Sequence, residues 1–329
     1  MTPININMNI YSKNEWGTLK QVIVGVADYA NIPAMDKSLR VVNYADRGDV
    51  SDIKLGRYPT QVIDESNEDL DRFVNLLESM SIEVLRPNRV PVEYYNYCPR
   101  DTIFVHGNSA IATPMSLSSR EFEFRNVEHH FDNLSIAKNY QGDDMYDDSC
   151  IKNADKLALT EIAPKFDAAN VIRANDHLLY LVSNSGNRRG AEYLQEFVGN
   201  DVKVHILEDV YSYMHIDSTI AFLREGLLLA NPSRIKSKDV LPEYFRNWDI
   251  IWAPDPVDIG HYPGYCNSSK WINVNLLSIN PNFVVMEEHQ HPLRKELEKY
   301  NIECAMMPLR HSRTLGGCFH CVTLDTIRE

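Results

Sequence analysis

The amino-acid sequence predicts an α/β protein in which similar units form a closed ring. Three observations support this prediction. One pattern recurs along the chain: an apolar strand, a tight turn, a second strand, an amphipathic helix and a short third strand. The hairpin strands are almost continuously apolar, which is typical of strands covered on both faces. The two chain ends supply the parts of one further unit, and pairing them would leave no exposed sheet edge.

The first two units each begin with a hairpin that turns at an Asn-containing pair, Gly107-Asn108 and Asn175-Asp176, and the third hairpin is expected to turn at Glu225-Gly226. Residues 100–114 predict the first hairpin, and a helix is expected over 119–131. Residues 168–183 predict the second hairpin, followed by a helix within 186–199 and a strand over 202–207.

The third and fourth units repeat this order. Their hairpins are expected over 218–232 and 271–287, their helices over 239–248 and 291–300, and their third strands over 249–254 and 302–309. Pro292 suits the first turn of the fourth helix, because that position needs no N–H.

The fifth unit combines both ends of the chain. Its expected parts are a strand over 18–26, a helix over roughly 64–80, a strand over 81–87 and the C-terminal strand FHCVTLDT over 319–326. Because this unit needs both ends, we expect residues 1–329 to form a single domain.

Composition excludes some classes of protein. Hydrophobic residues make up 44% of the chain, which is ample for a core, and the net charge is −13 with Lys and Arg dispersed. A nucleic-acid partner is therefore not expected. The sequence shows no signal peptide and no apolar run of membrane-spanning length, so we expect a cytoplasmic protein without membrane contact. The six cysteines are then expected to be thiols.

Polar residues stand at the start of the first hairpin strand in every unit, where a core strand would not favour them. They are Asp101, Asp167, His215, Asp217, Ser268, Ser269 and Cys321. Each has a structural explanation, since an Asp before a strand is usually a turn cap. Independent caps have no reason to recur at the same phase of five units, however. We therefore expect these residues to converge at one end of the ring axis.

These residue types indicate chemistry on a guanidine. Carboxylates that face one cavity repel each other unless a cation binds there, and a guanidinium matches two carboxylates bidentately. A thiolate can attack the guanidinium carbon. His215 can protonate the departing amine and later deprotonate its replacement, with a carboxylate orienting the ring.

The C-terminal motif Cys318-Phe319-His320-Cys321 has three interpretations. A redox Cys-x-x-Cys normally opens a helix, whereas a β-rich segment follows this motif. A zinc site needs a second ligand pair, and the other cysteines stand alone. A single nucleophile beside a bystander fits better. The preceding Gly316-Gly317 pair would let the backbone approach a ligand closely.

The sequence resembles the arginine-dependent amidinotransferases, a family that includes glycine amidinotransferase and the inosamine-phosphate amidinotransferases. The resemblance runs from about residue 12 almost to the end. The motifs that carry it are NEWGTLKQVIVG (14–25), CPRD (98–101), FDAANVIR (166–173), MHIDSTI (214–220), NPSR (231–234), SSKW (268–271) and HSRTLGGCFHC (311–321). It implies the pentein fold, a five-bladed α/β propeller with strand-strand-helix-strand blades, closed by the N- and C-terminal segments.

The resemblance also implies a role for each matched residue. Cys321 would be the nucleophile, His215 the general acid and base, and Asp167 the carboxylate that supports His215. Asp101 and Asp217 would hold the guanidinium, while Arg234 with Ser268 or Ser269 would hold the α-carboxylate of L-arginine. No cofactor and no metal are expected. A homodimer is compatible with the resemblance.

Two departures from the family pattern bear on the amine acceptor and the glycine loop. Ser212 stands where the glycine enzymes commonly have Asn, and we expect Ser212, Tyr213 and Met214 to line the acceptor route. A smaller residue opens volume there, which favours an acceptor larger than glycine, such as lysine or a biosynthetic intermediate in a secondary-metabolite or toxin pathway. Cys318 replaces the usual third glycine. The alternatives are an arginine deiminase-like guanidine hydrolase and an inactive guanidine-binding protein.

Overall fold

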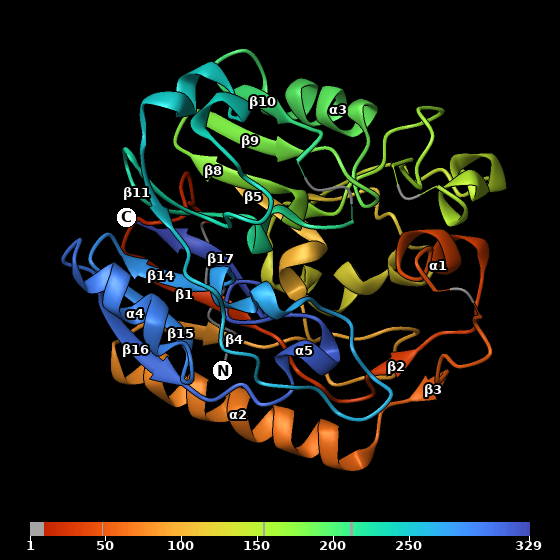
Figure 1. The fold of residues 1–329 in the computed structure, drawn as a ribbon, viewed down its shortest axis with the longest axis horizontal. Coiled ribbons are helices and arrows are strands. Elements are labelled where there is room, and N and C mark those ends of the chain that lie inside the picture. The colour runs from red at the N-terminus through yellow and green to blue at the C-terminus, as the bar shows by residue number, and fades with distance from the viewer. Residues whose placement is uncertain (1–9, 48, 154, 211–212) are drawn as a thin grey trace, which may run out of the picture.

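Five three-stranded sheets of one pattern make up most of the β-structure in the described residues. The computed structural model describes residues 10–47, 49–153, 155–210 and 213–329. In each of these sheets the central strand pairs antiparallel with one neighbour and parallel with the other (Figure 1). The expected recurrence of a hairpin and a third strand is therefore present, and the structure adds that the third strand pairs parallel.

The strands of these sheets are as follows. One sheet contains β5 (Ile103–His106), β6 (Ser109–Ala112) and β7 (Ser135–Ile136), and the next contains β8 (Val171–Ala174), β9 (His177–Leu181) and β10 (Lys203–Leu207). Another two contain β11 (Ile220–Arg224), β12 (Leu227–Ala230) and β13 (Asp249–Trp252), and β14 (Leu277–Asn280), β15 (Phe283–Glu287) and β16 (Glu303–Met307). The last joins β1 (Leu19–Val24), β4 (Glu83–Leu85) and β17 (Thr323–Arg328). A separate pair consists of β2 (Asn31–Ile32) and β3 (Gly56–Arg57).

Helices pack beside several third strands. The long α2 (Thr60–Ser79) contacts β4, α3 (Arg188–Val198) contacts β10, and α4 (His291–Glu298) contacts β16 (Figure 1). Helix α2 buries Ile63, Leu70, Phe73 and Leu77, which recur at helical spacing and so form one apolar face. The shorter helices are α1 (Lys37–Val42) and α5 (Ser312–Leu315).

Two of the expected helices are wrong. Residues 119–131 and 239–248 instead contain short 3₁₀ helices, namely Ser118–Arg120, Glu123–Asn126 and Glu128–His130, and Lys238–Val240 and Glu243–Asn247. In the first segment the charged Arg120 is buried with Asp101 and Glu123 while the apolar Phe122 remains 54% exposed, so burial does not follow the apolar face of a helix. In the second, Pro242 removes a backbone donor in the middle of the segment.

The hairpin turns agree with the sequence. Gly107 and Gly226 adopt φ values of 56° and 77°, a left-handed region that glycine enters without steric cost, and the expected turns lie at these residues.

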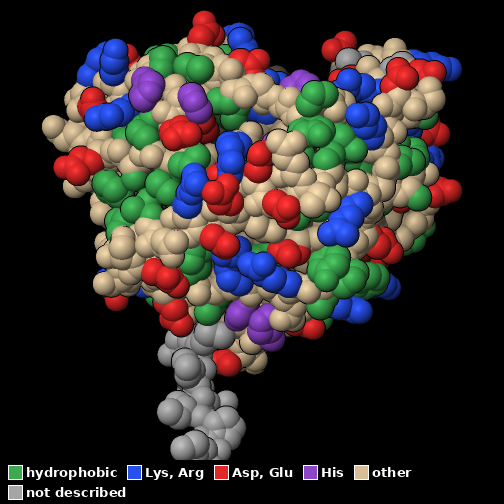
Figure 2. Space-filling model, turned by 90° about the horizontal axis from the view of Figure 1, so that it is seen from below, with side chains coloured by type: hydrophobic (Ala, Val, Ile, Leu, Met, Phe, Trp, Pro, Cys, Tyr) green, Lys and Arg blue, Asp and Glu red, His purple; other side chains and the backbone are tan. Residues whose placement is uncertain are grey.

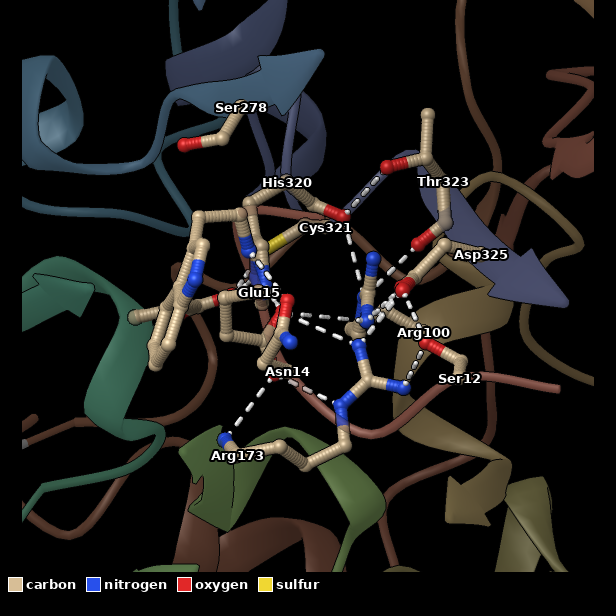
Figure 3. A network of polar contacts seen from close by, with 12 residues as sticks. Ser12, Asn14, Glu15, Arg100, Arg173, Ser278, His320, Cys321, Thr323 and Asp325 are labelled. Carbon is tan, nitrogen blue, oxygen red and sulfur yellow. Dashed lines mark hydrogen bonds and ion pairs between the residues drawn. The ribbon is translucent and has the colours of Figure 1, made fainter. Parts of the chain in front are cut away.

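A buried ionic cluster joins both ends of the chain to the middle (Figure 3). The Arg173 guanidinium lies 2.8 Å from Glu15 Oε1 and 2.7 Å from Asp325 Oδ2. Asp325 also accepts from Ser12 and pairs with Arg328. Three cations, counting Arg100, therefore surround two carboxylates, which satisfies charges that would be costly to bury alone. This cluster fixes β17 against β8 and the N-terminal segment.

The surface shown in Figure 2 mixes acidic and basic side chains and has no stripe of one sign. None of the helices in the described ranges combines the length and apolar character needed to cross a bilayer.

Candidate active site

One pocket collects most of the polar residues singled out from the sequence. It encloses about 740 Å³ of space, part of it open to solvent. Its lining includes Asp101, Tyr213, Met214, His215, Asp217, Ser268, Ser269 and Cys321. The expected convergence of these positions is therefore present in the structure.

Short 3₁₀ turns place several of these side chains. Asp101 is the last residue of one turn (Pro99–Asp101), just before β5. Asp167 directly precedes another (Ala168–Asn170), and Asp217 lies inside a third (Ile216–Ser218). Ser269 caps the turn Lys270–Val274 by accepting from a backbone N–H. Asp101, Asp167 and Asp217 thus stand two to four residues before their strands. Ser269 differs from the expectation, because β14 begins only at Leu277, eight residues later.

The expected position of Cys321 within a strand is wrong by two residues. β17 begins at Thr323. The backbone N–H groups of Cys318 and Cys321 each donate to Asn275 Oδ1 at 3.1 Å, so a side chain takes the donor that a strand would use for its ladder. The Cys321 thiol is thereby held next to the pocket.

Cys321 has two polar partners at its sulfur. Sγ lies 2.9 Å from Asp217 Oδ2, and Asn275 Nδ2 donates to it at 3.0 Å. Contact with Cys98, burial and the Asp217 carboxylate together raise the pKa of the Cys321 thiol well above its ordinary value, although His215 opposes this. The site without substrate therefore favours the neutral thiol.

His215 lies between two carboxylates. Its Nε2 is 2.9 Å from Asp167 Oδ2, and its Nδ1 is 3.6 Å from Asp101 Oδ1. Burial disfavours the imidazolium, but the charge of Asp101 and the hydrogen bond with Asp167 outweigh it, so the pKa of His215 lies well above its ordinary value. Asp167 is itself fixed, because Oδ1 accepts from the Ser116 N–H at 2.9 Å. His215 is therefore poised as a proton donor.

Asp101 is hydrogen-bonded on one oxygen only. Its Oδ2 accepts from Arg120 at 2.7 Å, whereas Oδ1 is buried without a hydrogen bond and lies 3.6 Å from His215 Nδ1. Arg120 also bonds Glu123 at 2.8 Å and lies over the Tyr95 ring. Burial raises the pKa of Asp101 despite the nearby His215 and Arg120. A buried carboxylate oxygen without a hydrogen bond at a pocket wall suits a cationic ligand.

Ser268 and Ser269 line the pocket, whereas Arg234 contacts this wall without being among the lining residues. Arg234 NH2 contacts Ser269 Oγ at 3.3 Å, and its NH1 contacts Ser218 Oγ and Thr219 Oγ1 at 2.7 and 2.8 Å. Ser268 Oγ is buried without a hydrogen-bond partner. A positive charge therefore lies next to the hydroxyl groups of this wall.

Met214 and Tyr213 lie on the same pocket as expected, and Ser212 lies outside the described residues. The Tyr213 hydroxyl donates to the Asn43 carbonyl at 2.7 Å, and Asn43, Tyr94 and Tyr95 also line the pocket. Its ring thus belongs to an aromatic wall.

Sequence reasoning missed Asn275, Arg120 and the role of His320. His320 contacts Asp217 and Glu15, not a metal partner. Arg120 lies in a segment read as a surface helix, and nothing in the sequence around Asn275 distinguishes it from a turn residue. Among the described residues no cluster of three or more His, Cys, Asp or Glu side chains is arranged to hold a metal ion.

Similar proteins are amidinotransferases. No protein-family model matches the chain. Inosamine-phosphate amidinotransferase 1 of Streptomyces glaucescens is 38% identical over 336 residues, which cover 96% of this chain and 95% of that protein. L-arginine:L-lysine amidinotransferase of Pseudomonas savastanoi pv. phaseolicola is 32% identical over 347 residues, covering 97% and 94%.

Solved structures agree with these relatives. Inosamine-phosphate amidinotransferase of Streptomyces griseus superposes with a TM-score of 0.90 at 37% identity, covering 97% of each chain. An amidinotransferase of Microseira wollei from the saxitoxin biosynthetic pathway gives a TM-score of 0.85 at 28% identity, again covering 97% of each chain. The α/β fold is thus that of solved amidinotransferases.

Proposed function

Since the chain belongs to the amidinotransferase family, we propose that it transfers the amidino group of L-arginine to a primary amine through a covalent intermediate on Cys321. One observation carries this proposal. A thiol, a histidine held by Asp167, and the carboxylates of Asp101 and Asp217 face one pocket.

The donor guanidinium would bind between Asp101 and Asp217. Its positive charge offsets the carboxylate charge that keeps Cys321 protonated, so the thiol loses its proton to solvent as the donor binds. Binding the cation thus generates the nucleophile only when a substrate is present.

Cys321 Sγ then attacks the guanidinium carbon, and a C–S bond forms. His215 Nδ1, the nitrogen not bonded to Asp167, protonates the departing nitrogen, the C–N bond breaks and ornithine leaves. In the second half, the acceptor amine attacks the amidino carbon and His215 takes its proton. The C–S bond breaks and frees Cys321.

Arg234 would select the donor by its α-carboxylate, together with Ser268 or Ser269. The observed contact between Arg234 and Ser269 supports a shared role, since both could bond to one carboxylate.

We further propose that the acceptor is larger than glycine. Tyr94, Tyr95 and Tyr213 offer aromatic surface that a glycine molecule could not cover. The relatives are named for an inosamine phosphate and for lysine, and one solved neighbour belongs to a saxitoxin pathway, so a secondary-metabolite or toxin pathway is the context we propose. We also infer that the five sheets are blades of one propeller domain, closed by β1 and β17.

Incubation with arginine and no acceptor tests the proposal. Ornithine should be released and Cys321 should gain an amidino group, detected by peptide mass mapping, while Cys321→Ala should form neither. Cys318→Gly is the matched control and should stay active. An amidino group on Cys318 in place of Cys321 would contradict the assignment of the nucleophile. Release of citrulline and ammonia would identify an arginine deiminase-like hydrolase instead.

The acceptor is tested by comparing kcat/KM for glycine with that for lysine and longer amines. A preference for glycine would contradict the proposed acceptor size.

A further inference from the structure

His320 connects the pocket to the buried ionic cluster (Figure 3). Its Nδ1 lies 2.9 Å from Asp217 Oδ2, and its Nε2 lies 3.4 Å from Glu15 Oε2. All three side chains are buried. The residue next to the thiol in sequence therefore contacts a carboxylate of the pocket and a carboxylate of the cluster.

Each ring nitrogen of His320 has a carboxylate as its partner. A neutral imidazole has one donor and one acceptor nitrogen, and a carboxylate can only accept. Both ring nitrogens of His320 face carboxylate oxygens, so both bonds form only when both nitrogens carry protons. Other charges near Glu15 include Arg173, bonded to it at 2.8 Å, Arg100 at 3.8 Å and the Asp325 carboxylate.

Packing alone does not hold this ring. A cavity of about 10 Å³, room for roughly one water molecule, borders His320, Asp217 and Glu15, and its other walls include Ile172, Phe222 and Leu276. Because the packing has this gap beside the ring, the two hydrogen bonds help to set the orientation of the ring.

We propose that His320 is a positioning residue that holds the Asp217 carboxylate for the substrate cation, with Glu15 as its anchor. This inference rests on the proposed function, in which Asp217 binds the guanidinium. His320 and Cys321 both contact Oδ2, so rotation of the carboxylate is restricted and Oδ1 is the oxygen we assign to the substrate.

Burial alone would raise the pKa of Asp217, but the hydrogen bond and charge of His320 outweigh it and the pKa lies below its ordinary value. His320 thus keeps Asp217 ionised as well as oriented.

Two substitutions test the hydrogen bonds of His320 Nδ1 and Nε2 separately. The amide nitrogen of Asn occupies roughly the place of Nδ1, and that of Gln roughly the place of Nε2. His320→Asn should keep a donor for Asp217 and leave the KM for arginine within about threefold of the parent. His320→Gln should lose that donor and raise KM by about 10- to 100-fold, the range expected when a bond to a charged group is lost, with a smaller change in kcat. Equal KM values, or a loss in kcat alone, would overturn the proposal.

A second readout needs no turnover. Because a cation between the carboxylates favours the Cys321 thiolate, millimolar guanidinium chloride should accelerate the alkylation of Cys321 by iodoacetamide in the parent and in His320→Asn, but not in His320→Gln. If the parent transfers no amidino group yet shows this pattern, the proposed function fails and the role of His320 stands. If the parent is active and guanidinium changes the alkylation rate of all three proteins equally, the role of His320 fails alone. Urea unfolding of each variant checks that the fold is retained.

Discussion

Arg234 offers a quantitative test of how the donor is recognised. Its NH1 contacts the Ser218 carbonyl at 2.9 Å as well as the hydroxyls of Ser218 and Thr219, and its NH2 faces Ser269. We therefore expect only the NH2 side to bond to the α-carboxylate of arginine. One such bond to a charged group contributes about 1.5–3 kcal/mol. Arg234→Ala should then reduce kcat/KM for arginine by about 10- to 150-fold.

Agmatine distinguishes a loss of carboxylate binding from general damage to the site, because it has the guanidine of arginine without the carboxylate. Arg234→Ala should change kcat/KM for agmatine little, so the preference for arginine over agmatine should collapse. Ornithine or putrescine release gives both rates. Thr219→Val is the control: it removes one NH1 contact but keeps the charge, and the preference should persist. An equal loss for both donors in Arg234→Ala would refute this reasoning.

Three further predictions concern charge in the buried site. The pKa of the Cys321 thiol is raised from the ordinary 9.0, so without substrate its alkylation by iodoacetamide should accelerate only above about pH 9. Asp217→Asn removes one cause of this raised pKa and should move the acceleration to lower pH. An unchanged pH profile in Asp217→Asn would contradict the contact between Asp217 and Sγ. Arg120→Met leaves Asp101 and Glu123 buried without their cation and should destabilise the protein by about 3–5 kcal/mol in urea unfolding, whereas a cost below about 1 kcal/mol would show that the pair is not buried in solution. Burial raises the pKa of Asp325, but Arg100 and Arg173 outweigh burial and hold this pKa well below 3.8 in the folded protein. Ionised Asp325 therefore contributes to the free energy of unfolding above the ordinary carboxyl pKa, and this contribution is lost as the pH falls through and below that value. Asp325→Asn should flatten that acid dependence in urea titrations between about pH 5 and pH 3, and an unchanged slope would argue against the cluster.

Local chemistry explains which parts of the fold were predictable. Hairpin turns at Gly107 and Gly226 follow from backbone preferences of single residues, so the sequence predicts them well. The segment 119–131 was misread because its apolar residues suggested amphipathic character, while the buried pairing of Arg120 with Asp101 and Glu123 holds it in 3₁₀ turns.

The site was predictable where the residue type implies the chemistry, as for Cys321 and His215. Asn275 was not, because its importance depends on backbone N–H groups more than 40 positions away. His320 was considered only as a metal ligand or redox neighbour. Its partners Asp217 and Glu15 are distant in sequence, and no pattern near His320 predicts these contacts.

The pairing of β1 with β17 has a consequence for biosynthesis. Val22 lies opposite Asp325, so β1, which is synthesised early, can pair with β17 only after some three hundred further residues have been synthesised. Until then β1 has an open edge, and closing so long a loop is slow. Cys321, the proposed nucleophile, emerges in the same late stretch, after Asp101 and Asp217 of its pocket. A nascent chain therefore cannot carry a finished reactive thiol, and we expect chaperone dependence during synthesis to centre on the exposed edge of β1.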